Sequence, residues 1–437
     1  MGQRSEGSAE SRRLSRRRVV RSIAATLGTA GIGGCLRSDR QETTPAATAS
    51  PDASTATATQ AARSETAAPE TPTETRTPFA TPEPNREIAG EWTTAYHDQQ
   101  NTAYAADATG PRDRVGAKWQ TEVDRNIFPR AGVAVVDNTV LAGLYGGAML
   151  ALDGRDGSEQ WRASVGGDVY ATPAVADGTA VFGATDGKLH AVSVSDGSEQ
   201  WTYETGYPPN VPVTVVDGTV YASVMYDRLT GAVVAIDLST GRRRWRVDTE
   251  IQEEATPAVV DGTVYVGSSD TLYALDAATG RERWSRSDGA GPYNTTAVDD
   301  DRIYVTTEQG RVLAVDRDDG SRQWQRSIDP DVPTGPARSP AGVVVADWDG
   351  GVRLLAPSDG TVRWKRSLDV GRPVRGHPTV TPEAVYVGNH RIDIADGTVR
   401  GPVGPGRSVY QSTVAGGTLL YAVRRRLIAV QTEEPPE

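Results

Sequence analysis

Residues 256–267 read Thr256-Pro-Ala-Val-Val-Asp-Gly-Thr-Val-Tyr-Val-Gly267, and residues 272–284 read Leu272-Tyr-Ala-Leu-Asp-Ala-Ala-Thr-Gly-Arg-Glu-Arg-Trp284. Related phrases surround seven tryptophans spaced 39–44 residues apart: Trp119, Trp161, Trp201, Trp245, Trp284, Trp324 and Trp364. A unit of this length is too short to bury its own apolar face, so its copies must stack on one another. We therefore interpret these tryptophans as structural residues of a repeat protein.

Each repeat has the pattern of short antiparallel strands. Val and Tyr alternate with small or polar residues, and Asp-Gly or Thr-Gly turns interrupt the pattern every six to ten residues. In the clearest repeat, this pattern predicts strands A, B, C and D at residues 255–260, 263–268, 271–276 and 281–285. Four-stranded units at a period near 40 residues predict an all-β fold, the β-propeller.

The number of blades follows from the C and D strands. Eight C strands can be counted, and they end near Asp153, Ser193, Asp237, Asp276, Asp316, Ala356, Asp393 and Val430. The D strands also number eight, because residues 398–402 form one in which Gly401 replaces the Trp. The D strand at Trp119 precedes every A strand, and only a short tail follows the last C strand. We expect residues 115–122 to complete an eighth blade, which closes the ring without a free sheet edge.

These phrases resemble the PQQ-type repeat of quinoprotein dehydrogenases and of BamB-like outer-membrane assembly lipoproteins. The resemblance covers roughly residues 90–431, and an opening segment with Trp92, His97-Asp98 and Asn101-Thr-Ala-Tyr104 is similar to the segment before the first blade in that family. It implies an eight-bladed propeller. The resemblance does not identify the function, because the family contains enzymes, scaffolds and sensor domains.

The N-terminus has the features of an export and lipidation signal. Residues 15–21, Ser-Arg-Arg-Arg-Val-Val-Arg, have the form of a twin-arginine signal centred on Arg16 and Arg17. An apolar run too short for a stable membrane span follows, and it ends in Ile-Gly-Gly-Cys35, which resembles a lipobox. The alternatives are an exposed basic tail and an unmodified cysteine. We expect a signal peptide at residues 1–34 and a lipidated Cys35 that anchors the protein to the outer face of the cytoplasmic membrane.

Residues 35–88 consist mainly of Thr, Ala, Pro, Ser and Glu. Such a composition cannot bury enough apolar surface to fold, and it predicts a disordered tether. A flexible coil of about 50 residues spans about 40 Å. The Thr and Ser beside Pro also fit an O-glycosylated stalk. The predicted organisation is completed by the propeller at residues 89–431 and a disordered tail at residues 432–437.

Charge argues against a nucleic-acid partner. The chain has a net charge of −11, and residues 1–34 contribute +5, so the exported part carries −16. A surface of that sign repels phosphate backbones. The basic residues include only three lysines, Lys118, Lys188 and Lys365. Both salt adaptation and a GC-rich genome favour this composition.

The strand order gives the propeller two different rims. The A–B and C–D turns on one rim, such as Asp261-Gly262 and Thr279-Gly280, are minimal hairpin turns. The B–C and D–A connections on the other rim are irregular and carry unlike side chains, which favours a binding surface there. The alternative is that each side chain packs over a neighbouring turn. The candidate binding residues are Arg130, Tyr145, Tyr170, Asn210, Tyr226, Glu254, Tyr293, Trp348, Arg375 and His390.

An enzyme is the alternative function. The resemblance implies, for the dehydrogenases, a PQQ cofactor held against a vicinal disulfide, with a calcium ion bound by Glu, Asn and Asp. Cys35 is the only cysteine, so this disulfide cannot form. The four histidines lack metal-site spacing, and no catalytic triad or phosphate-binding motif is present. We therefore expect no catalytic residue, metal or cofactor, and a scaffold or binding role with a protein or envelope-complex partner. PQQ and calcium belong only to the alternative.

The anchoring prediction can be tested by Cys35→Ser, which removes the only acylation site of the lipobox. The variant is expected to appear in the medium or to remain an unprocessed precursor, and Arg16→Lys with Arg17→Lys is expected to block export. Cell fractionation and the mass of the processed chain measure both effects. A Cys35→Ser protein that stays with membranes at the wild-type mass contradicts the prediction.

Overall fold

All regular elements in the described part of the chain are β-strands. The computed structural model describes residues 86–112, 115–127, 131–226, 231–249, 255–287, 294–307, 309–328, 332, 334–371, 373–374, 376–405, 408 and 410–432. The predictions for Arg16, Arg17, Cys35 and the tether up to residue 85 lie outside these residues. Within them, no helix has the length and hydropathy that a membrane span requires.

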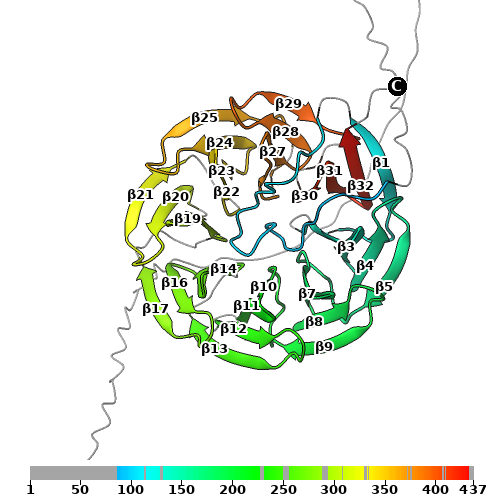
Figure 1. The fold of residues 1–437 in the computed structure, drawn as a ribbon, viewed down its shortest axis with the longest axis horizontal. Helices are drawn as coiled ribbons and strands as arrows, with labels where there is room; N and C mark the ends of the chain where they lie inside the picture. The colour runs from blue at the N-terminus through cyan, green and yellow to red at the C-terminus, as the bar shows by residue number, and fades with distance from the viewer. Residues whose placement is uncertain are drawn as a thin grey trace, which may run out of the picture. The chain divides into compact units, whose positions relative to one another are not determined.

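The strands form four-stranded antiparallel sheets, the blades, which follow one another around a ring (Figure 1). Blade 1 contains β2 (Val133–Val136), β3 (Thr139–Leu144), β4 (Ala148–Asp153) and β5 (Glu159–Ser164). Blade 2 contains β6 (Ala174–Ala176), β7 (Thr179–Ala184), β8 (Lys188–Ser193) and β9 (Glu199–Glu204). Blade 3 contains β10 (Thr214–Val216), β11 (Thr219–Met225), β12 (Gly231–Asp237) and β13 (Arg243–Thr249). Blade 4 contains β14 (Ala258–Val260), β15 (Thr263–Gly267), β16 (Thr271–Asp276) and β17 (Glu282–Ser287).

The second half of the ring repeats this arrangement. Blade 5 contains β18 (Ala297–Val298), β19 (Arg302–Thr307), β20 (Arg311–Asp316) and β21 (Arg322–Ser327). Blade 6 contains β22 (Ala337–Ser339), β23 (Gly342–Ala346), β24 (Gly351–Leu355) and β25 (Val362–Ser367). Blade 7 contains β26 (Thr379–Val380), β27 (Ala384–Val387), β28 (His390–Asp393) and β29 (Val399–Pro402). Blade 8 contains β30 (Ser412–Ala415), β31 (Thr418–Val423), β32 (Arg426–Thr432) and β1 (Val115–Glu122).

This architecture confirms the predicted all-β, eight-bladed propeller of four-stranded antiparallel blades. The A strands are shorter than predicted: β14 begins at Ala258 rather than at residue 255. Pro257 precedes it, and a proline has no N–H to donate to the neighbouring strand. The A–B turn that follows has positive φ at both Asp261 (46°) and Gly262 (68°), which matches the right-handed twist of the flanking strands.

Ring closure also follows the prediction. Strand β1 pairs with β32 in antiparallel register, with Trp119 opposite Ala429, and so the two ends of the repeat region meet in blade 8. The sheet order β1-β32-β31-β30 leaves β1 in the outer position that a D strand has in the other blades. A residue bulges out of the ladder just before Trp119, as it does before Trp284 in blade 4.

Each repeated tryptophan contacts the next blade. Trp245 of blade 3 is buried, and its Nε1 donates to the carbonyl oxygen of Ala277 in blade 4 at 2.8 Å. Gly280, with a φ of +73°, lies against the indole so closely that a Cβ there would come within 2.9 Å of the ring. The same indole hydrogen bond joins Trp119 to Gly154, Trp161 to Val194, Trp201 to Leu238, Trp284 to Arg317, Trp324 to Pro357 and Trp364 to Ile394.

Blade 7 lacks this tryptophan for a structural reason. Gly401 pairs with Arg391 at the position where Trp284 pairs with Ala274 in blade 4. The acceptor of a repeated indole lies in the C–D turn of the next blade. Blade 8 has no such turn, because its C strand β32 and its D strand β1 come from opposite ends of the repeat region. An indole at residue 401 therefore has no equivalent acceptor.

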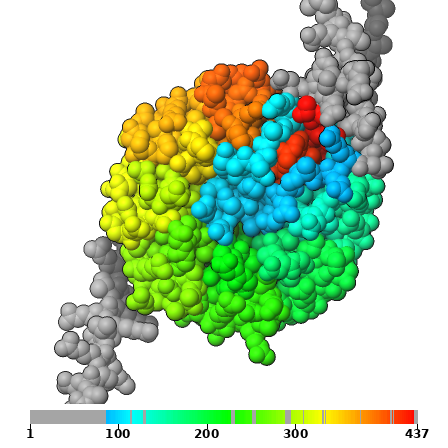
Figure 2. Space-filling model, viewed as in Figure 1, coloured from blue at the N-terminus to red at the C-terminus, as the bar shows by residue number. Residues whose placement is uncertain are grey.

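Residues 86–112 cross the rim formed by the A–B turns, where they cover the middle of the ring (Figures 1 and 2). Backbone hydrogen bonds join this segment to the A strands of six blades, through Val135, Val175, Val259, Val298, Arg338 and Val380. The amides of Thr109 and Gly110 also donate to the carbonyl of Gly416, in the A–B turn of blade 8. The segment thus satisfies inner strand edges that would otherwise be unpaired. We call it the plug.

The packing of Trp245 predicts a graded loss of stability. Trp245→Ala removes a buried indole and its hydrogen bond, and we expect the free energy of unfolding to fall by about 3–5 kcal/mol. Trp245→Phe keeps an aromatic ring and loses the N–H donor, so its loss should be smaller. Urea denaturation followed by circular dichroism measures both. If the Ala variant is as stable as wild type, the contact with blade 4 does not hold the ring together.

Candidate functional site

The rim opposite the plug is formed by the B–C turns and the D–A connections, and we call it the open rim. Of the candidate binding residues, the structure describes Tyr145, Tyr170, Asn210, Tyr226, Trp348 and His390. Arg130, Glu254, Tyr293 and Arg375 lie outside the described residues. The six described residues fall into three groups: some line a central cavity, one lines a groove, and the others pack against neighbouring residues of the rim.

The central cavity has a volume of about 110 Å³ and lies on the axis of the ring. Its floor is made by the plug residues Ala95 and Tyr96, and its walls are made by residues just before the A strands. Tyr170 and Asn210 are the two candidate residues that line it. The other lining residues are Ala171, Val211, Pro212, Asn294, Thr295, Thr334, Gly335, His377 and Gln411.

Hydrogen bonds hold the walls of the cavity to its floor. The Tyr96 hydroxyl donates to Thr295 Oγ1 at 3.3 Å, and Gln411 Nε2 donates to the carbonyl oxygen of Ala95 at 3.5 Å. The ring of Tyr96 also makes an edge contact with His377, with 4.5 Å between centroids. Burial lowers the pKa of His377 to about 4, so its imidazole is neutral at pH 7. The described lining of the cavity is therefore polar and uncharged.

Two tyrosines stand between this cavity and a second depression. Tyr145 from blade 1 and Tyr170 from the connection to blade 2 meet edge to face, with 5.4 Å between centroids. The Tyr170 hydroxyl donates to Asp168 Oδ2 at 2.9 Å, and this hydrogen bond helps raise the pKa of Tyr170 to about 12. Asp168 also accepts from the amide of Gly146 at 2.7 Å, which fixes the turn that carries Tyr145.

The second depression lies where blade 8 meets blade 1, and we call it the seam groove. Its volume is about 580 Å³. One side is the B–C turn of blade 8, and the other is the chain that leaves β1. The lining residues are Glu122, Asn126, Ile127, Tyr145, Tyr410, Val423, Arg424, Arg425 and Arg426. It is a basic and aromatic groove on the open rim.

Three candidate residues are packed against neighbours. The guanidinium of Arg246 lies 3.8 Å from the ring centroid of Tyr226, and burial raises the pKa of Tyr226 to about 12. Trp348 is half-buried, and its carbonyl oxygen accepts from the amide of Val374. His390 is only 4% exposed, at the start of β28. His390 thus offers little surface to a partner.

Sequence reasoning missed Tyr96, His377 and Gln411 in the cavity and the three arginines of the groove. His377 and Gln411 could have been found by aligning the repeats. Both occupy the position just before an A strand that Thr256 has in blade 4. The run Arg424-Arg425-Arg426 was visible as three basic residues in a turn of an acidic chain. The position of Tyr96 depends on the path of the plug, which no repeat pattern specifies.

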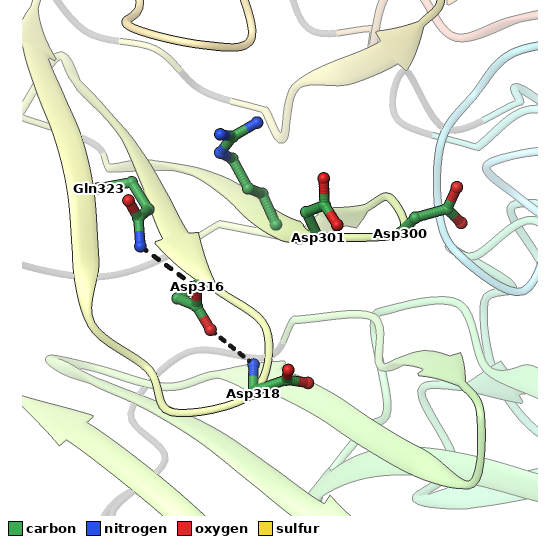
Figure 3. Close-up of a pocket in the computed structure, with 6 residues that line it drawn as sticks. Asp300, Asp301, Asp316, Asp318 and Gln323 are labelled. Carbon is green, nitrogen blue, oxygen red and sulfur yellow. Dashed lines mark hydrogen bonds between the residues drawn. The ribbon is translucent and has the colours of Figure 1, made fainter.

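An acidic depression of about 260 Å³ lies on the rim of the A–B and C–D turns of blade 5 (Figure 3). Asp316 accepts there from the amide of Asp318 and from the side chain of Gln323, so its oxygens serve the local turn. Asp300 and Asp301 come from the opposite turn and point away from Asp316 in Figure 3. Among the described residues, no three His, Cys, Asp or Glu side chains are grouped as ligands of a metal ion.

The central cavity does not fit PQQ. Pockets for ligands of this size typically have about 300–1,000 Å³, whereas the cavity has about 110 Å³ and is floored by Tyr96. PQQ also carries several carboxylates. None of the described lining residues is cationic, since His377 is neutral at pH 7. A group that enters this cavity from the open rim meets a small space with an uncharged described lining.

The state of His377 makes stability depend on pH. In the unfolded chain its pKa returns to about 6.5, so between pH 6.5 and 4 the unfolded state binds a proton that the folded state excludes. The free energy of unfolding therefore falls as the pH falls through this window. In His377→Gln this contribution is absent, so relative to wild type the variant should gain on the order of 3 kcal/mol across the window.

Urea denaturation at pH 7 and at pH 4.5 measures this difference. Gln411→Ala is the control, because it alters the same wall without removing a titrating group. Its effect on stability should be the same at both pH values. If His377→Gln changes the free energy of unfolding by the same amount at pH 7 and at pH 4.5, the imidazole of His377 is not buried in its neutral form.

Comparison with known proteins agrees with the geometry. The sequence matches the family described as outer membrane protein assembly factor BamB over residues 101–247 and 229–434. A search of curated proteins found no match. Among solved structures, BamB from Moraxella catarrhalis is 19% identical with a TM-score of 0.59, and the match covers 71% of this chain and 99% of that one.

Two dehydrogenases share the fold. A quinohemoprotein alcohol dehydrogenase from Comamonas testosteroni is 14% identical with a TM-score of 0.67, over 80% of this chain and 82% of that one. A europium-containing methanol dehydrogenase is 14% identical with a TM-score of 0.65, over 78% and 98%. Identities this low show a common fold and no common activity. The predicted resemblance is confirmed by the family match: this chain belongs to the BamB family of outer membrane protein assembly factors, whose repeats are of the PQQ type.

Proposed function

We propose that this protein is an exported, membrane-anchored scaffold that binds a protein or an envelope complex through its open rim. The observation that carries the proposal is the difference between the two rims. The plug occupies the rim of the A–B turns, with backbone hydrogen bonds to seven blades, whereas the seam groove and the mouth of the central cavity lie on the other rim. A partner thus finds shaped, uneven surface on the open rim.

The place where the described chain enters the propeller also favours the open rim as the binding face. The amide of Ile88 donates to Asn138 Oδ1 in the A–B turn of blade 1, and Glu87 pairs with Arg155 in the C–D turn of that blade. The described chain therefore begins on the plugged rim. This starting point leaves the open rim free for a partner.

The family supports a binding role, since its description is that of an assembly factor. PQQ-dependent oxidation is the alternative, and it is favoured only by the fold shared with the two dehydrogenases. The volume and the uncharged described lining of the central cavity count against a PQQ site. Purified protein that gains PQQ absorbance and reduces a redox dye in the presence of PQQ and calcium would favour the enzyme instead.

Substitutions on the two rims test the proposal. Trp348→Ala and Asn210→Ala alter the open rim, and each is expected to weaken capture of the partner by about 1–2 kcal/mol if it is a contact residue. Thr240→Ala and Thr279→Ala are the controls, because both lie in C–D turns of the plugged rim and their hydroxyl groups make hydrogen bonds only within their own turns, to the turn Asp and from the amide of Arg242 or Arg281.

The partner is first identified by affinity capture from solubilised membranes with the full-length wild-type protein. Binding of each variant to the purified partner is then measured by titration, and the melting temperature of each variant is recorded to exclude unfolding. Loss of binding in the Thr240 or Thr279 variant, with no loss in the other two, would assign the partner to the plugged rim.

A further inference from the structure

The seam groove carries positive charge in a chain whose net charge is −11. Arg424, Arg425 and Arg426 are all exposed, and within the described part of the chain none of them forms an ion pair. Other exposed arginines do have carboxylate partners: Arg244 pairs with Asp237 at 2.7 Å, and Arg283 pairs with Asp276 at 2.9 Å. Within the described residues no ion pair neutralises these three guanidinium groups, although Arg425 Nε makes one hydrogen bond to a backbone carbonyl.

The backbone holds one of these arginines in an unfavourable conformation. Arg424 has a φ of +57°, in the left-handed region that side chains other than Asn and Asp rarely adopt. The equivalent turn of blade 7 has Gly388, with a φ of +60°, at this position. Glycine adopts this conformation without strain. An arginine in place of glycine indicates that the side chain has a use that outweighs the strain.

The rest of the groove is preformed and apolar. Ile127 and Val423 line it with the rings of Tyr145 and Tyr410. Its walls are fixed by backbone contacts, because the amide of Tyr145 donates to the carbonyl oxygen of Asn126 at 2.9 Å and Ile127 bridges to Leu144. On the other side, Arg425 Nε donates to the carbonyl oxygen of Val123 at 3.1 Å. A ligand therefore meets a formed site.

The groove contains one acidic side chain. Glu122 lies directly opposite Arg426 in the β1–β32 pairing, so these two charges offset each other at the edge of the groove. Arg424 and Arg425 have no such neighbour among the lining residues. The lining thus has a net positive charge beside two tyrosine rings, a combination that is enriched where proteins bind other proteins.

We propose that the seam groove docks an extended acidic segment of a partner protein, with carboxylates on Arg424 and Arg425 and an apolar or aromatic side chain against Tyr145 and Tyr410. This inference rests on the proposed function and names the chemistry of the partner. A peptide fits better than a membrane surface, because a flat layer of headgroups cannot enter a depression. It fits better than a glycan, because aliphatic Ile127 and Val423 offer no hydrogen bonds to hydroxyl groups.

A pair of synthetic peptides tests the inference on the full-length protein. The acidic probe is fluorescein-labelled Gly-Glu-Asp-Tyr-Leu-Glu-Asp-Gly, and the neutral probe is Gly-Gln-Asn-Tyr-Leu-Gln-Asn-Gly with the same label. Fluorescence anisotropy at low salt should show binding of the acidic probe, on the order of tenfold tighter than the neutral one, and this difference should shrink as salt is raised.

The double variant Arg424→Gly, Arg425→Gln is expected to weaken binding of the acidic probe on the order of tenfold. Gly relieves the strain at residue 424, but Arg425→Gln removes the hydrogen bond from Nε to the carbonyl oxygen of Val123. The melting temperature of the variant is therefore recorded, and lost binding at an unchanged melting temperature is assigned to the lost charges. Arg281→Gln is the matched control, since it removes an exposed arginine from the plugged rim. Tyr145→Ala should weaken both probes, because it removes the apolar contact.

Equal binding of the two probes, or unchanged binding by the double variant, overturns the inference. So does a wild-type protein that ignores both probes and binds phosphatidylglycerol vesicles or polygalacturonate through Arg424 and Arg425. Capture from solubilised membranes separates this failure from that of the proposed function. If the wild type and the double variant capture the same partner equally well, the proposed scaffold function is retained, and the seam groove is not the docking site. If the wild type captures none, the proposed function fails.

Discussion

The contact between a D-strand tryptophan and the C–D turn of the next blade is the interaction on which the ring depends. It is made of a buried indole, a hydrogen bond such as the 2.8 Å one from Trp245 to Ala277, and a glycine whose missing Cβ leaves room for the ring. Each blade is too small to be stable alone, so these contacts couple the blades into one cooperative structure. The exception at Gly401 follows the same rule, because blade 8 offers no C–D turn to receive an indole.

Much of this fold can be predicted from the sequence because the information is repeated. The period of the tryptophans, the Asp-Gly and Thr-Gly turns and the position of residues 115–122 specify the blades, their number and the closure of the ring. The candidate site is less predictable, since it depends on contacts between residues far apart in the chain. Tyr96 reaches Thr295 and His377 only because the plug crosses the axis, and Tyr145 meets Arg424 and Arg425 only at the seam.

The plug gives the two faces of a nearly symmetric ring different roles. Eight similar blades alone would enclose a channel with two open ends. Residues 86–112 pair with the inner strands of six blades, fill one end and bring Tyr96 under the central cavity. On the open rim lie a small cavity, whose described lining is uncharged, and a larger basic groove. The groove has the volume of a typical ligand pocket, whereas the cavity is smaller than such pockets.

The pairing of β1 with β32 has a consequence for the order in which the molecule is assembled. Trp119 and Ala429 are partners in one sheet although more than three hundred residues separate them, and a contact between such distant segments is slow to form because of the entropy of closing a long loop. While the chain is being synthesised, blades 1 to 7 can stack in turn, but β1 has no partner until β32 leaves the ribosome. Closure of the ring therefore cannot occur before residues 426–432 have been synthesised. A chain that ends before β32 leaves β1 and β31 with unpaired strand edges, which chaperones and proteases recognise. Closure of blade 8 thus distinguishes a chain that contains β32 from a truncated one.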